Sequence, residues 1–153
     1  MNFSNHKNEH IDTKTIKIEV NIDDMSAEIL GYLMDKLISE GANDVFYTSI
    51  HMKKNRPAIM LQVLCAENEL DKMKEIIFLE TTTFGLRYFP LEVHRLERRF
   101  ISVNTKWGPV TIKEGLFQGE VVQRSPEYED CKRISNEVGI PLKDVYTDVW
   151  RKL

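Results

Sequence analysis

The sequence is poor in cysteine, with only Cys65 and Cys131 among its 153 residues. The two cysteines form no C-x-x-C pair, and each stands inside an apolar pattern rather than in a loop. This usage argues against a disulfide framework and against a structural zinc site with closely spaced thiolate ligands. It predicts two buried free thiols in a reducing compartment.

Long hydrophobic runs are also missing. No apolar stretch approaches the roughly 20 residues of a membrane span, and the N-terminus has no apolar signal core. The formal net charge of -3 gives no global attraction to nucleic acid or to anionic membranes. We therefore expect a cytoplasmic protein that binds neither nucleic acid nor membrane, and in which any anion site is local.

Hydrophobic periodicity supplies the elements that are present. "TIKIEVN" alternates apolar and polar residues, which predicts a strand, and a stripe from Met25 to Leu37 repeats at helical spacing. The two periods continue in the order β-α-β-β-α-β, which is typical of a ferredoxin-like core with both helices on one face of an antiparallel sheet. The predicted elements span residues 15–21, 25–38, 43–52, 57–65, 67–80 and 86–96.

The remaining residues predict an addition to that core. Residues 98–115 are typical of a β-hairpin, and "GEVVQR" indicates another short strand. Ser125 as an N-cap and Pro126 at the first helical position predict a helix that Gly139 ends. Pro141 then opens a last helix.

The predicted fold class is therefore α+β, a ferredoxin-like βαββαβ core with an added β-hairpin and two C-terminal helices. We expect a disordered N-terminal tail over residues 1–14, because that stretch is polar and without periodicity. The ferredoxin-like domain is expected over residues 15–98, and a hairpin and helical subdomain over residues 99–153.

Three clusters are richer in polar chemistry than local structure requires, and the first follows the first strand. It contains Asn21, Asp23 and Asp24. Adjacent carboxylates are the oxygen ligands that Mg²⁺ and Mn²⁺ prefer, and they can hold such an ion against the phosphates of a nucleotide. Asp24 or Ser26 can equally cap the helix that follows, so both interpretations stay open.

The second cluster is a basic turn between two apolar strands. It contains Lys53, Lys54, Asn55 and Arg56, and Pro57 stiffens it. Arginine binds a phosphate bidentately and lysine supplies a point charge, so this turn suits a polyphosphate or an acidic partner. A charged turn that discourages edge-to-edge aggregation explains the same residues equally well.

The third cluster is "ETTTFGLR", where a helix gives way to a strand. Its hydroxyl and guanidinium groups, on Thr81, Thr82, Thr83 and Arg87, can bind phosphate or ribose oxygens. It is not a P-loop, since no G-x-x-x-x-G-K-[ST] is present. The sequence leaves open whether the basic turn meets the other two loops within one subunit or across an interface.

Three long motifs, taken in order and spacing, resemble the C-terminal part of the LarC nickel insertion proteins. They are "VNIDDMSAEILGYLMDKLISEGANDVFYTSIHMKKNRPAIMLQVLC", "ETTTFGLR" and "PEYEDCKRISNEVGIPLKDVY". The match runs from about Thr15 to the C-terminus. Several long motifs in register are more specific than any single short one.

The resemblance implies a CTP-dependent nickel chelatase, or cyclometallase, of the lyase class. Such a protein inserts nickel into pyridinium-3,5-bisthiocarboxylic acid mononucleotide and completes the nickel-pincer nucleotide cofactor of lactate racemase. The resemblance also implies CTP bound with Mn²⁺ or Mg²⁺ in this region, a homo-oligomer that is a trimer or a hexamer, and an N-terminal LarC portion in cis or in trans.

On this resemblance, the three clusters contribute to one nucleotide site. The expected nucleotide ligands are Lys53, Lys54, Asn55, Arg56, Thr81, Thr82, Thr83 and Arg87, and the expected metal ligands are Asp23 and Asp24. A non-catalytic nucleotide-sensing or assembly oligomer of ferredoxin-like subunits is the alternative. RNA binding on the sheet face is disfavoured, because "AIMLQVLC" lacks the aromatic side chains on which bases stack.

Overall fold

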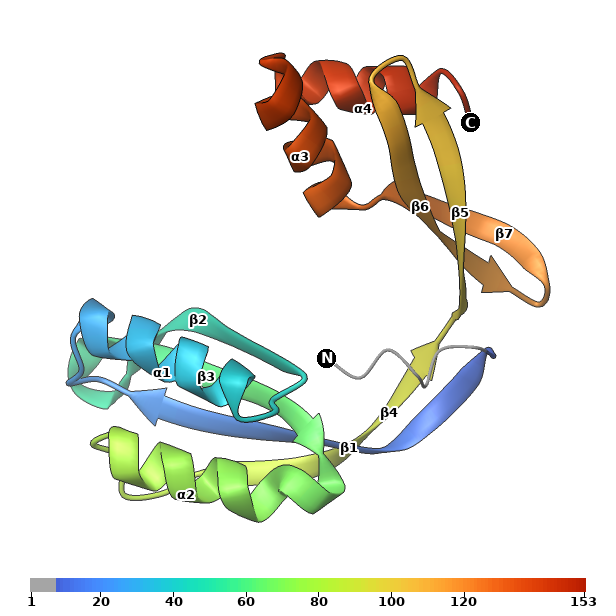
Figure 1. The fold of residues 1–153 in the computed structure, drawn as a ribbon. Helices are drawn as coiled ribbons and strands as arrows, with labels where there is room; N and C mark the ends of the chain where they lie inside the picture. Colours follow the sequence, from blue (N-terminus) through green and yellow to red (C-terminus); the bar gives the residue numbers. More distant parts are fainter. Residues whose placement is uncertain (1–7) are drawn as a thin grey trace. The chain divides into compact units, whose positions relative to one another are not determined.

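The computed structural model describes residues 8–153, which form two compact units. Unit 1 holds residues 11–93, and unit 2 holds residues 8–10 together with residues 94–153. Figure 1 shows the elements of both units. Those of the first sheet and its helices are β1 (His10–Ile22), α1 (Ala27–Ser39), β2 (Asp44–Met52), β3 (Arg56–Ala66), α2 (Leu70–Glu80) and β4 (Arg87–Arg95).

The first sheet has four strands in the order β2-β3-β1-β4. Both β1 and β2 pair antiparallel with β3, with Ile22 opposite Ile59 and Met52 opposite Arg56. Together with the β-α-β-β-α-β succession, this order agrees with the predicted arrangement, and it confirms the α+β class.

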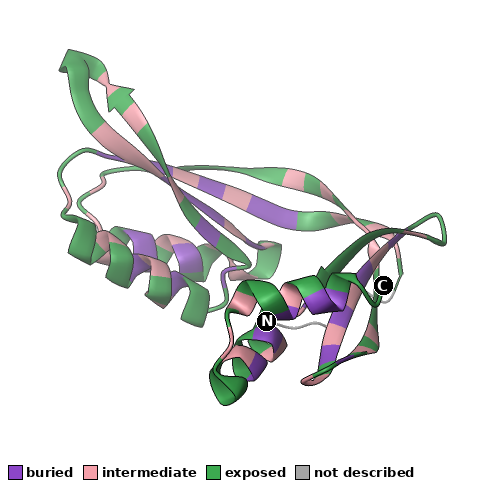
Figure 2. Cartoon of the chain, turned by 90° about the horizontal axis from the view of Figure 1, so that it is seen from above, coloured by how far each residue is buried: buried purple, intermediate pink, exposed green. Residues whose placement is uncertain are grey.

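One face of this sheet is buried under α1 and α2. Over residues 16–22 of β1, buried residues alternate with half-buried ones, and Figure 2 shows this kind of alternation by colour. Leu33 and Leu37 of α1 and Met73 and Ile77 of α2 are completely buried in the same core. Their strand partners in that core are Ile16, Ile18, Val20, Ile22, Val45, Leu61, Val63 and Cys65.

Unit 2 is built on a three-stranded antiparallel sheet in the order β5-β6-β7. Its elements are β5 (Glu97–Thr105), β6 (Gly108–Phe117), β7 (Glu120–Pro126), α3 (Tyr128–Val138) and α4 (Leu142–Trp150). The helices cover one face, where the buried core consists of Val110, Ile112, Cys131, Ile134, Val145 and Val149. No helix within residues 8–153 is long and apolar enough to cross a membrane.

The N-terminal tail differs from the prediction where it is described. Strand β1 already begins at His10, so residues 10–14 are extended and not disordered. Asp12 accepts hydrogen bonds from the Lys14 N–H at 2.9 Å and from the Thr15 hydroxyl at 3.0 Å, which gives these polar residues local partners. Residues 1–7 lie outside the described part of the chain.

The start of α3 also differs from the prediction. Pro126 is the last residue of β7, opposite Ile112, and the helix begins two residues later with Glu127 as its N-cap. The Glu127 N–H donates to the Thr111 carbonyl at 2.8 Å, so the sheet pairing continues past the predicted capping residue, Ser125. Gly139 ends α3 as predicted, in the left-handed conformation with φ of 73°.

The two thiols are free and completely buried, as predicted. Burial raises the pKa of Cys65 to about 11 and also raises the pKa of Cys131. We expect the native protein to react with a thiol-specific disulfide reagent at pH 8 far more slowly than the urea-unfolded chain, which exposes both thiols. Rapid reaction of two thiols in the native state would contradict this packing.

Candidate functional site

The three polar clusters lie at one end of the sheet of unit 1. Asp23 and Asp24 follow the end of β1, and the basic turn, residues 53–56, joins β2 to β3, with Arg56 as the first residue of β3. The threonine loop, residues 81–86, leads from α2 into the start of β4. Because β1 and β2 are both antiparallel to β3, the ends of β1 and β2 and the start of β3 lie together. The threonine loop joins them through the contact of Thr82 with Asp24, so the three clusters meet within one chain.

Side-chain contacts join the first cluster to the other two. The Arg56 Nη1 donates to Asp23 Oδ2 at 3.0 Å. The Thr82 hydroxyl donates to the carboxylate of Asp24. Ser26 caps α1 by accepting from the Ile29 N–H at 3.4 Å, so capping occupies neither aspartate.

The basic turn has an unusual backbone. Lys54 and Asn55 have φ angles of 62° and 56°, in the left-handed region that side chains with a Cβ rarely adopt. Lys53 and Lys54 are exposed, and within residues 8–153 no ion pair engages either ammonium group. Residues held in sparsely populated backbone conformations cluster at active sites and ligand-binding sites.

The threonine loop has three hydroxyl groups, of which two bind backbone carbonyls nearby in the sequence and one binds a residue of another cluster. The Thr81 hydroxyl donates to the Ile77 carbonyl at 2.7 Å and closes the end of α2. The Thr83 hydroxyl donates to the Gly85 carbonyl at 2.8 Å and shapes the loop itself. Of the three, Thr82 is the residue whose hydroxyl binds a residue of another cluster.

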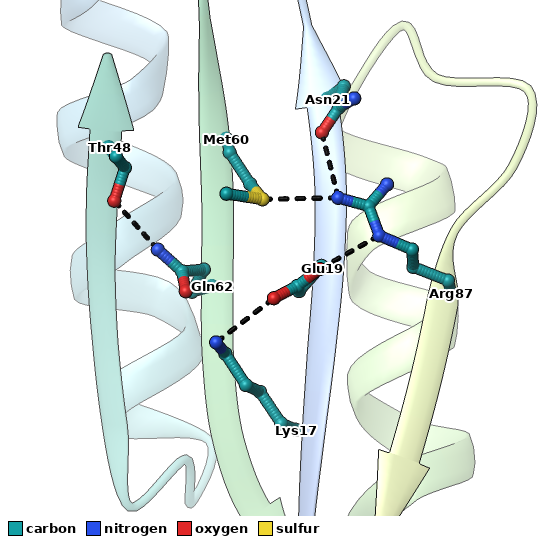
Figure 3. A network of polar contacts seen from close by, with 7 residues as sticks. All are labelled: Lys17, Glu19, Asn21, Thr48, Met60, Gln62 and Arg87. Carbon is teal, nitrogen blue, oxygen red and sulfur yellow. Dashed lines mark hydrogen bonds and ion pairs between the residues drawn. The ribbon is translucent and has the colours of Figure 1, made fainter. Parts of the chain in front are cut away.

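Arg87 lies on the open face of the sheet, opposite the helices (Figure 3). Its Nε donates to Glu19 Oε2 at 2.8 Å, and its Nη2 contacts Asn21 Oδ1 and Met60 Sδ, each at 3.1 Å. Asn21 and Arg87 were predicted with the loops, and the structure instead places both in this network. Hydrogen bonds from Lys17 and then Arg87 lower the pKa of Glu19.

A second charged cluster escaped the sequence analysis. Glu114 of β6 is only 1% exposed and binds Arg99 of β5 and Arg124 of β7. The hydrogen bonds that Arg99 and, to a smaller extent, Arg124 donate to Glu114 lower the pKa of its carboxyl group. The available signal was the position of Glu114 in the alternation Val110, Ile112, Glu114, Leu116, which points toward the core.

Within residues 8–153, no group of three or more His, Cys, Asp or Glu side chains lies close enough to hold a metal ion. Asp23 and Asp24 are thus an adjacent pair of carboxylates, each with a partner from another loop.

Comparisons with known proteins point to a single family. Residues 2–146 match the family model described as nickel insertion protein. A pyridinium-3,5-bisthiocarboxylic acid mononucleotide nickel insertion protein from Thermotoga petrophila is 49% identical over 140 residues, which are 92% of this chain and 35% of the relative. A relative of the same name from Acetivibrio thermocellus is 47% identical over 141 residues, 92% of this chain and 34% of the relative.

A solved structure agrees with these relatives. It is that of LarC2, the C-terminal domain of a cyclometallase involved in the synthesis of the NPN cofactor of lactate racemase, in its apo form. The TM-score is 0.88 at 38% identity, with 94% of this chain and 98% of the other covered. The chain spans about a third of the length of the curated relatives that it matches.

The Glu19 network predicts a pH dependence of stability. Because the folded-state pKa of Glu19 is lowered, its contribution is complete above the ordinary glutamate pKa of about 4.3 and is lost as the pH falls through the folded-state value. Urea unfolding between pH 6 and pH 2.5 should therefore show a flatter acid loss of stability in Glu19→Gln than in the wild type. Glu75→Gln, which removes an exposed charge of α2, is the matched control. Equal slopes for Glu19→Gln and the wild type would contradict the network.

Proposed function

The chain belongs to the nickel insertion protein family, and we propose that it is the CTP-binding, C-terminal part of a CTP-dependent nickel insertase. The full protein would complete the nickel-pincer nucleotide cofactor of lactate racemase. The observation that carries the proposal is the meeting of three polar clusters at one end of one sheet, through the contacts Arg56–Asp23 and Thr82–Asp24.

Charge complementarity supports a nucleoside triphosphate as the ligand. Lys53, Lys54 and Arg56 bring three positive charges to this end of the sheet, where Asp23 and Asp24 carry two negative charges. A triphosphate with one bound divalent cation keeps a net charge of about -2, so the two are electrostatically complementary. Arg56 uses one N–H on Asp23, and its guanidinium has further donors for a phosphate oxygen. Asn55 adds an amide at the same turn.

The aspartate pair fits a divalent cation that is shared with the nucleotide. Mg²⁺ and Mn²⁺ take oxygen ligands, and Mg²⁺ is typically held by one or two carboxylates together with substrate phosphates. Asp23 and Asp24 supply that number of carboxylates. Bound there, the cation would neutralise phosphate charge. Asp23 would bind the cation, and Arg56 would shift from Asp23 toward a phosphate. The Thr82 hydroxyl would keep the Asp24 carboxylate oriented.

The remaining predicted ligands have different supporting roles in this proposal. Thr81 and Thr83 shape the loop through their backbone hydrogen bonds, so that Thr82 faces Asp24. Arg87 stays in the Glu19 network and anchors the start of β4. We assign nickel, as the substrate metal, and the pyridinium mononucleotide to the complete protein, with the N-terminal portion in cis or in trans and a trimer or hexamer as its assembly.

The proposal predicts selective, charge-dependent binding of CTP. Calorimetric titration of the chain with CTP and Mn²⁺ should give saturable binding, and ATP should bind more weakly. Lys54→Glu combined with Arg56→Glu should weaken CTP at least about a hundredfold, because two phosphate contacts become repulsive. The fold should survive, since no ion pair within residues 8–153 engages Lys54, and the Arg56 ion pair is exposed and contributes about 0–1 kcal/mol.

The matched control reverses two charges on α2. Lys72→Glu combined with Lys74→Glu removes two surface ion pairs, with Glu40 and Asp71, outside the three clusters. This double variant should bind CTP as the wild type does. Retained affinity in the Lys54 and Arg56 variant, or an equal loss in the control, would overturn the site. Binding of CTP with no turnover in the presence of nickel, the mononucleotide and the N-terminal portion would favour the sensing or assembly alternative.

A further inference from the structure

Unit 2 contains a buried carboxylate that orients two arginines. The Arg99 Nε and Nη2 donate to Glu114 Oε2 at 2.8 and 2.6 Å, and the Arg124 Nε donates to Glu114 Oε1 at 2.9 Å. The strands set this order, because Glu114 lies opposite Arg99 on one side and Arg124 on the other. The trio carries a net charge of +1 when all three groups are ionised.

Arg124 also lines a shallow hollow of about 390 Å³, together with Val121, Val122, Gln123 and Trp150. The Arg124 side chain is 42% exposed, and Trp150 is 50% exposed. Within residues 8–153, the hydrogen bonds of Arg124 engage only its Nε. Its two terminal nitrogens, the pair that binds a carboxylate end-on, are therefore available at the hollow.

The strand that forms this hollow is irregular. The register of β6 with β7 shifts between Gly115 and Leu116, so that Gln123 faces Gly115 while Val121 faces Leu116. This bulge places Val122 as the extra residue, and Val122 is 49% exposed. A Cβ added at Gly115 would lie 3.1 Å from Leu96 Cδ1 and 3.4 Å from Gln123 Cβ, so glycine allows the close approach. Bulges of this kind re-aim side chains near binding sites.

We propose that this hollow binds an aromatic ring that carries a carboxylate. The carboxylate takes the two terminal nitrogens of Arg124, while Glu114 fixes the guanidinium from behind. The ring packs on Trp150 and Val122, whose exposed apolar surface has no other described cover. The site lies in unit 2 and uses none of the residues of the proposed nucleotide site, so the inference does not rest on CTP binding.

The two tryptophans of the chain provide the readout. Pyridine-3-carboxylate is titrated into the ¹⁵N-labelled full chain, and the indole N–H resonances of Trp150 and Trp107 are followed by NMR. The Trp150 resonance should shift saturably while that of Trp107, which is partly buried and packs against the core of unit 2, should stay in place. The uncharged pyridine-3-carboxamide has the same ring and should bind about tenfold more weakly, because a hydrogen bond to a charged partner is lost.

Three variants separate binding from folding. Arg124→Gln should weaken the carboxylate about tenfold, and Val122→Asp should weaken it at least as much while leaving the Glu114 trio intact. Arg98→Gln is the matched control, since Arg98 is next to Arg99 in β5 and points to the opposite face. An unshifted Trp150 resonance, equal binding of acid and amide, or unchanged affinity in a folded Val122→Asp variant would each overturn the inference.

Discussion

The antiparallel register of β1 on β3 is the constraint on which unit 1 depends. It sets Ile22 opposite Ile59, so that the polar residues just beyond each strand end come together. The same register buries Ile16, Ile18 and Val20 and turns Lys17, Glu19 and Asn21 to the open face. Because side chains alternate along a strand, a slip of one residue would bury the charged set and expose the core. The hydrophobic core therefore fixes both the position of the loops and the face of the polar network.

Ion pairs and hydrogen bonds orient the charged side chains that the strand register brings together. Asp23 and Asp24 are held by Arg56 and Thr82, residues that lie 33 and 58 positions away in the sequence. The exposed lysines of the basic turn keep their charge available for a ligand, on a backbone that is left-handed at Lys54. In unit 2 the carboxylate is buried and the cations are exposed, because Glu114 binds Arg99 and Arg124 from inside the unit. Both units thus present cations whose orientation is fixed by a carboxylate.

Much of this architecture could be predicted from periodicity. The apolar stripes gave the core helices and strands, and Gly139 marked the end of α3. The start of α3 could not be predicted, because Pro126 fits both a first helical turn and the strand that pairs with Ile112. Local composition identified the residues of the three clusters but not their partners. Arg87 binds Glu19 across 68 positions, and Thr81 and Thr83 satisfy backbone groups, which only the tertiary structure decides. Glu114 was missed because its arginines are placed by strand pairing.

The most direct measurement is the paramagnetic broadening of backbone amide resonances by Mn²⁺ in the presence of CTP, because it locates the ion within the chain. The strongest broadening is expected at residues 23–24, with further broadening at residues 53–56 and 82, and no broadening is expected when CTP is omitted at the same low Mn²⁺ concentration. Broadening centred on other residues, with residues 23–24 unaffected, would contradict the assignment of the nucleotide site to this end of the sheet.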